Sequence, residues 1–105
     1  MVEKARLMVV DDYRQMQRLL QKVLVANGYA VSLATNGEES LQRLRDDEVD
    51  IVLSDVRMPA MDGMDLLRQI RERYPETTVI MMTAFGAVDS AVEAMKAGAY
   101  DYISK

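Results

Sequence analysis

Short apolar runs alternate with helical patterns along this chain, and that alternation limits the folds it can form. Residues 7–10, 51–53 and 79–82 are continuous apolar runs, which are typical of strands buried on both faces. Residues 29–34 alternate apolar and small or polar side chains, as an edge strand does, and residues 99–103 are a fifth, weaker candidate. We therefore expect five strands separated by helices.

The segments between these strands carry helix signals. Asn36 with Glu39 three residues later resembles a capping box, and Asp62 is a candidate N-cap. Apolar residues recur there at helical spacing: Met16, Leu19, Leu20, Val23 and Leu24; Leu41 and Leu44; Leu66, Leu67 and Ile70; and Val88, Val92 and Met95. The order is βαβαβαβαβ, which favours an α/β fold with a parallel sheet.

Chain length and the handedness of crossovers restrict the arrangement further. A chain of 105 residues forms one domain, here residues 1–105. Right-handed crossovers, with the second strand on one side of the first and the others on the opposite side, give the strand order 2-1-3-4-5. This is the doubly wound, flavodoxin-like order. The first helix then covers one face alone, and the other three cover the opposite face.

Polar side chains follow the strands at the edge where such sheets bind ligands. Asp11 and Asp12 follow the first strand and Asp55 the third, while Thr83 and Lys105 follow the fourth and fifth. The switch point of this topology lies between the first and third strands, at their carboxyl ends. Each residue also has a plain structural interpretation, as a helix cap, a loop or turn residue, or a solvated tail. Together they predict a polar site.

Composition narrows the chemistry of that site. The chain has no Cys and no His, which excludes thiolate sites, Ser-His-Asp triads and imidazole acid–base catalysis. Three carboxylates suit Mg²⁺, and a carboxylate beside Mg²⁺ can attack a phosphoryl donor and form an acyl phosphate. The net charge of −4 disfavours direct binding of nucleic acid, and no apolar run is long enough for a membrane span or a targeting segment. We expect a cytoplasmic protein.

Five short motifs in this order resemble the receiver domain of bacterial two-component response regulators. They are VVDD at 9–12, LSDVRMP at 53–59, MDG at 61–63, MTA at 82–84 and YISK at 102–105. The RMP segment at 57–59 and the segments 83–86 and 99–102 are similar to receivers of AAA+ enhancer-binding transcription activators. The resemblance covers the whole chain.

The resemblance implies a role for each motif residue. Asp55 matches the phosphoacceptor, and Asp11 and Asp12 match the acidic pair that holds Mg²⁺, with Asp12 as the expected direct ligand. The backbone carbonyl of Arg57 matches a further ligand, and Lys105 matches the lysine beside the phosphate. Thr83 and Tyr102 match the switch pair, and Pro59 and Gly63 shape the loop after the acceptor.

The resemblance also implies partners. It implies a sensor histidine kinase as phosphodonor and an output domain or partner protein that controls transcription. The resemblance thus implies a signalling module rather than an enzyme, with weak self-phosphorylation from small donors and with autodephosphorylation.

Two alternatives and one expectation about assembly accompany this interpretation. An Asp-nucleophile phosphatase would need a second carboxylate two residues after Asp55, where Arg57 stands. A phosphorylation-independent interaction module of the same fold would not require the full set of site residues. Receivers continue past the lysine with a fifth helix, and this chain ends at Lys105, so we expect bare apolar strands on one face and self-association.

Overall fold

The computed structural model describes residues 5–58, 60–83 and 88–104, and within the helices and strands it leaves the side chains of residues 88–90 and 104 undescribed. Within these residues, five strands and four helices strictly alternate. These are β1 (Arg6–Val10), α1 (Arg14–Ala26), β2 (Ala30–Ala34), α2 (Gly37–Asp46), β3 (Ile51–Asp55), α3 (Gly63–Arg73), β4 (Thr78–Thr83), α4 (Val88–Lys96) and β5 (Asp101–Ser104). The expected elements are all present, with β5 beginning two residues later than predicted.

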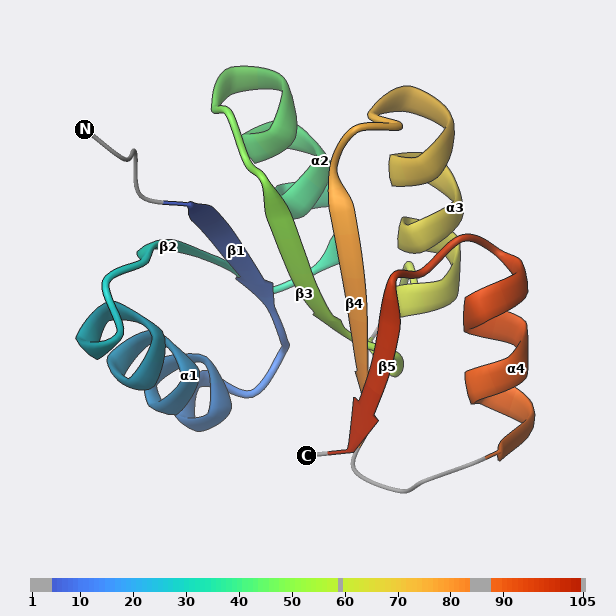
Figure 1. Cartoon of the computed structure of the whole chain (residues 1–105), viewed down its shortest axis with the longest axis horizontal. Coiled ribbons are helices and arrows are strands. Elements are labelled where there is room, and N and C mark those ends of the chain that lie inside the picture. Colours follow the sequence, from blue (N-terminus) through green and yellow to red (C-terminus); the bar gives the residue numbers. More distant parts are fainter. Residues whose placement is uncertain (1–4, 59, 84–87, 105) are drawn as a thin grey trace.

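The strands form one parallel sheet in the order β2-β1-β3-β4-β5, which confirms the predicted topology. Helix α1 lies on one side of this sheet and α2, α3 and α4 lie on the other (Figure 1). The first switch in strand order therefore falls between β1 and β3, as expected. None of the helices in the described part of the chain has the length and apolar character needed to cross a membrane.

Each face of the sheet has its own apolar core. The larger core joins β1, β3 and β4 to the buried face of α3, where Leu66, Leu67 and Ile70 are fully buried. The smaller core consists of Val9, Leu53 and Met82, covered by half-buried residues that include Leu20 and Leu24 of α1. The period of 3.6 residues in α3 and the short apolar strands thus account for most of the packing.

The caps predicted for α2 and α3 are confirmed. The Asn36 side chain accepts a hydrogen bond of 2.8 Å from the Glu39 N–H, and Asp62 accepts one of 2.9 Å from the Asp65 N–H. The Glu39 carboxylate bonds back to the Thr35 N–H at 3.2 Å, one residue earlier than in the usual capping box. Both helices therefore begin where the sequence predicts.

Two predicted apolar stripes are only partly buried. In α1, Leu19 and Val23 are 56% and 49% exposed, because the face that meets the sheet runs through Gln17, Leu20 and Leu24. In α4, Val92 and Met95 are exposed, and the small side chain of Ala94 is buried against the core. The helix positions are confirmed, and these four residues of the apolar stripes are exposed rather than part of the core.

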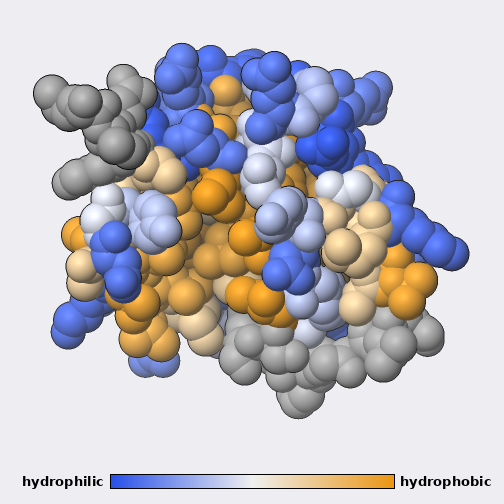
Figure 2. All heavy atoms as spheres, in the orientation of Figure 1, coloured by the Kyte–Doolittle hydropathy of each residue, from blue (hydrophilic) through white to orange (hydrophobic). Residues whose placement is uncertain are grey.

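The expectation of bare strands on the α1 face is also wrong for β3 and β4. Leu53 and Met82 are only 7% and 2% exposed, and half-buried residues of α1, β2 and β4 pack against the cluster that they form with Val9. Ile103 of β5 is exposed on this side, as expected. The space-filling view shows apolar atoms gathered over α1 and the adjacent strands (Figure 2). An apolar surface therefore exists on this side, over α1 and the adjacent strands.

Candidate functional site

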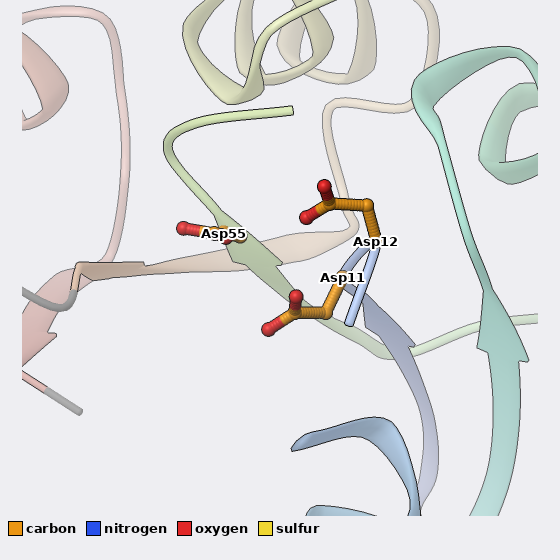
Figure 3. A group of neighbouring side chains, drawn as sticks. All are labelled: Asp11, Asp12 and Asp55. Atoms are coloured by element: carbon orange, nitrogen blue, oxygen red, sulfur yellow. The ribbon is translucent and has the colours of Figure 1, made fainter. Parts of the chain in front are cut away.

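Three carboxylates meet at the carboxyl ends of β1 and β3. Asp55 is the last residue of β3, and Asp11 and Asp12 directly follow β1. Val10 of β1 pairs with Ser54 of β3, so the two strands end at the same level. One carboxylate oxygen from each of the three residues lies within 4.8 Å of the others. Figure 3 shows the three side chains side by side at this edge, as predicted.

The three carboxylates differ in their surroundings. Asp11 and Asp55 are buried, whereas Asp12 is exposed. The Tyr13 N–H donates to Asp11 Oδ1 at 3.0 Å, and the Arg57 N–H donates to Asp55 Oδ1 at 3.3 Å. These bonds orient the two buried groups. The arrangement leaves Asp12 as the carboxylate most accessible from solvent.

The backbone around Asp55 is held by close packing against α3. The Val56 N–H donates to the Met82 carbonyl at 3.0 Å, and the Gly63 N–H donates to the Val56 carbonyl at 2.8 Å. A Cβ at Gly63 would overlap the Asp55 carbonyl oxygen and lie 2.8 Å from Val56 Cα. Only glycine therefore lets the first turn of α3 approach the end of β3 this closely, which is a physical reason for the expected role of Gly63 in this loop.

One residue of this region was missed from the sequence. Gln17 of α1 is 5% exposed, and its Nε2 donates to the Asp11 carbonyl at 2.6 Å and to the Ala34 carbonyl at 2.8 Å. The sequence does carry a signal for it. Gln17 lies three and seven residues before Leu20 and Leu24, so it is a polar residue on the buried stripe of the helix.

The predicted switch residues lie on β4, which pairs with β3, and on β5, the edge strand beyond it. Thr83 is the last residue of β4 and is half-buried, and it pairs with Ser104 of β5. Tyr102 packs against the larger core, and within the described part of the chain its hydroxyl oxygen is buried without a hydrogen-bond partner. Lys105 and Pro59 lie outside the described residues.

The alternative interpretation of Asp12 as a helix cap is not what the structure shows. The N-cap of α1 is Tyr13, and no side chain caps that helix. Arg57 is exposed in the loop after β3 and supplies no carboxylate at that position. The donor set is therefore three carboxylates, an all-oxygen set that suits a hard divalent cation such as Mg²⁺.

Comparison with known proteins gives the family. The family model of the response regulator receiver domain matches residues 7–105. Transcriptional regulatory protein ZraR of Klebsiella oxytoca is 44% identical over 103 residues, which are 98% of this chain and 23% of that protein. DNA-binding transcriptional regulator NtrC of Escherichia coli K12 is 43% identical over 97 residues, which are 92% of this chain and 21% of that protein. The chain thus spans less than a quarter of the length of these relatives.

Solved structures agree with the sequence relatives. A receiver domain protein from Clostridium thermocellum superimposes with a TM-score of 0.90 at 34% identity, over 96% of this chain and 82% of that one. A response regulator from Burkholderia pseudomallei, solved with a phosphorylated aspartic acid, a calcium ion and citrate, has a TM-score of 0.90 at 25% identity, over 97% of this chain and 60% of that one. The expected likeness to receivers of AAA+ enhancer-binding regulators is confirmed, since ZraR and NtrC are among the relatives. This chain therefore belongs to the receiver domains of two-component response regulators, a family of signalling domains.

Proposed function

We propose that this domain is a phosphorylation switch in which Asp55 accepts a phosphoryl group from the phosphohistidine of a partner sensor kinase. The observation that carries the proposal is the cluster of Asp11, Asp12 and Asp55, with carboxylate oxygens within 4.8 Å at the switch point of the sheet. The chain itself contains no His, so the phosphohistidine belongs to the partner. Membership of the receiver family supports the same role.

In the transfer step, an Asp55 carboxylate oxygen attacks phosphorus and forms an O–P bond. The N–P bond of phosphohistidine breaks, and the imidazole nitrogen keeps the electron pair and takes up a proton. The Arg57 N–H orients the carboxylate by its bond to Oδ1, and Gly63 keeps α3 close behind it. Lys105 is proposed as the cation that contacts the phosphoryl oxygens, as the family motif implies.

Asp11, Asp12 and Asp55, together with the backbone carbonyl of Arg57, are the groups that would hold Mg²⁺. When bound, Mg²⁺ would neutralise charge on the phosphoryl oxygens during transfer. The donor chemistry fits, because a close group of carboxylates repels itself unless a cation compensates it. The phosphorylated aspartic acid and calcium ion of the Burkholderia pseudomallei structure support the same pairing of aspartyl phosphate and hard cation.

Thr83 and Tyr102 are proposed to couple phosphorylation to a change of shape. Thr83 stands at the end of β4, beside the strand that ends in Asp55, and its hydroxyl is a donor suited to a phosphoryl oxygen. The buried Tyr102 hydroxyl has no hydrogen-bond partner among the described residues. Because an unpaired buried hydroxyl costs about 1–3 kcal/mol, the inward position of this ring competes with one in which the hydroxyl reaches water.

The output of the switch is proposed to be transcriptional control in the cytoplasm, through an attached output domain or a partner protein. The names of the relatives, both transcriptional regulators, support this proposal. A net charge of −4 leaves DNA contact to that output partner rather than to this domain.

Incubation with Mg²⁺ and a small phosphodonor, followed by intact mass measurement, tests the proposal. The wild-type chain should gain one phosphoryl group, and chelation of Mg²⁺ should prevent the gain. Asp55→Asn should gain none, because an amide is a poor nucleophile, while the exposed control Asp46→Asn should behave as wild type. An Asp55→Asn chain that gains one group at the wild-type rate would contradict the proposal. No gain in the wild type would instead favour the phosphorylation-independent module.

Self-association stays a prediction for the isolated chain. Leu19, Val23 and Ile103 are exposed on the α1 side of the sheet, where Figure 2 shows gathered apolar atoms. Burying such a surface against a second copy is favourable by about 25 cal/mol per Å². Light scattering coupled to size exclusion at micromolar concentration should show a dimer, and Leu19→Lys should weaken it more than Val25→Lys. A cooperative monomer would show that the exposed surface is too small to drive association.

A further inference from the structure

We propose that Gln17 is a positioning residue for the acidic pair, and that its side-chain amide sets where the Asp12 carboxylate lies. This inference rests on the proposed function, because it concerns the same Mg²⁺ site. Gln17 is a buried polar residue of α1, and its Nε2 is bonded to two backbone carbonyls. Its effect would pass through the backbone of the loop between β1 and α1.

The first step of the argument is the pair of hydrogen bonds from the Gln17 amide. Nε2 donates to the Asp11 carbonyl at 2.6 Å and to the Ala34 carbonyl at 2.8 Å. A primary amide carries two N–H donors on one nitrogen, so one neutral group serves both acceptors. No substitution by Met, Leu or an ionised Glu can reproduce this, because those side chains have no donor.

The second step is the planarity of the peptide bond between Asp11 and Asp12. Holding the Asp11 carbonyl oxygen fixes the plane that also contains the N and Cα atoms of Asp12. The Asp12 side chain is exposed, so its position depends on the backbone that carries it. The Gln17 amide therefore acts on the direction in which Asp12 leaves the chain.

The third step is the anchoring of the loop to the sheet. The Ala34 carbonyl also accepts the Asp11 N–H at 3.1 Å, and Asp11 Oδ1 accepts the Tyr13 N–H at 3.0 Å. Gln17 thus connects three parts of the fold: the end of β2, the acidic loop and the second turn of α1. Side chains that orient metal ligands through such bonds commonly change metal affinity 10–100-fold when they are removed.

The test compares Mg²⁺ affinity across matched variants by isothermal titration calorimetry. Gln17→Met keeps the volume and removes both donors, and we expect its Mg²⁺ dissociation constant to rise about 10-fold. Gln15→Met makes the same change at an exposed position of the same helix and should bind as wild type. Val79→Ala truncates a buried residue near the start of β4, at the end of the strand far from the acidic cluster. It should lower the melting temperature without changing Mg²⁺ affinity.

A second measurement needs no metal. Amide exchange of the Tyr13 N–H, followed by NMR in metal-free buffer, should speed up in Gln17→Met more than in Val79→Ala. Wild-type Mg²⁺ affinity in a folded Gln17→Met chain would overturn the inference, as would an equal loss in Val79→Ala. If Gln17→Met does not fold, Gln17→Asn takes its place, since the shorter Asn amide cannot reach both carbonyls. Wild-type Mg²⁺ affinity in that chain, or an equal loss in Val79→Ala, would again overturn the inference.

Failure of the proposed function has a different signature. It would appear as a wild-type chain that binds no Mg²⁺, or as an Asp12→Asn chain that binds Mg²⁺ as tightly as wild type. Loss of binding in Asp12→Asn together with wild-type binding in Gln17→Met would leave the function standing and remove only the role of Gln17.

Discussion

Replacing Gly63 by alanine should lower the stability of the domain and disturb the proposed phosphoacceptor site. The atoms around Gly63 indicate how large the loss of stability should be. The new Cβ would overlap the Asp55 carbonyl oxygen and lie 2.8 Å from both Val56 Cα and Met81 Cε. Two of these three neighbours are backbone atoms, which cannot rotate away. Overpacking of a core costs about 1–3 kcal/mol, and a backbone clash belongs at the upper end of that range.

Two other glycines provide matched controls for this substitution. At Gly37 the added Cβ would meet three side-chain atoms of Met61, with Sδ at 2.6 Å, Cγ at 3.0 Å and Cβ at 3.1 Å, and no backbone atom is among these neighbours. At Gly28 nothing lies within 4 Å, but φ is +92°, so alanine would meet only backbone strain of roughly 1–2 kcal/mol. The expected order of destabilisation is therefore Gly63→Ala, then Gly28→Ala, then Gly37→Ala.

Thermal and urea unfolding of the four chains would check this order. A loss of 3 kcal/mol corresponds to a fall in melting temperature of roughly 12–24 °C for a domain of this size. Gly63→Ala should also slow phosphorylation of Asp55 by the small donor, whereas Gly37→Ala should not. If Gly63→Ala costs no more stability than Gly37→Ala, the close approach of α3 to Asp55 is not the constraint that we infer.

Two further predictions concern the metal site and the switch. With Mg²⁺ at about 100 times its dissociation constant, the wild-type chain should gain about 2.7 kcal/mol of stability. Asp12→Ala should lose most of that gain, while the exposed control Asp47→Ala should keep it. An equal rise in melting temperature in all three chains would contradict the cation site. Tyr102→Phe should raise the melting temperature of the unphosphorylated domain, because it removes a buried hydroxyl that has no hydrogen-bond partner within the described part of the chain. A lower melting temperature would show that this hydroxyl is paired.

Sequence patterns predicted the elements, the strand order and the meeting of the three carboxylates, and each prediction depends on local or topological rules. Asp62 caps α3 because capping involves only residues three positions apart. Asp11 and Asp55 meet because parallel strands end at a common edge. These relations need no knowledge of how far a helix rotates about its own axis.

The errors arose where the rotation of a helix about its own axis and its tertiary contacts determine which side chains are buried. Leu19 and Val23 have helical spacing, but α1 turns them outward and directs Gln17, Leu20 and Leu24 to the sheet. The bonds of Gln17 depend on Ala34, which lies 17 residues away at the end of another strand. A polar residue on an apolar stripe marks such a position, but its partner appears only in the folded chain.

The position of each strand in the sheet divides the domain into parts that differ in local stability. The acidic cluster depends on β1 and β3, which have paired neighbours on both sides, whereas β5 is a four-residue edge strand that pairs only with β4. Edge strands open at lower free energy than central ones, and native-state hydrogen exchange detects such openings. We therefore expect the strand that carries Tyr102 to open more often than the strands that carry the acidic cluster. If the proposed switch operates, a change at the acidic cluster in the centre of the sheet would therefore be read at its margin, where little free energy is needed to shift the conformational equilibrium.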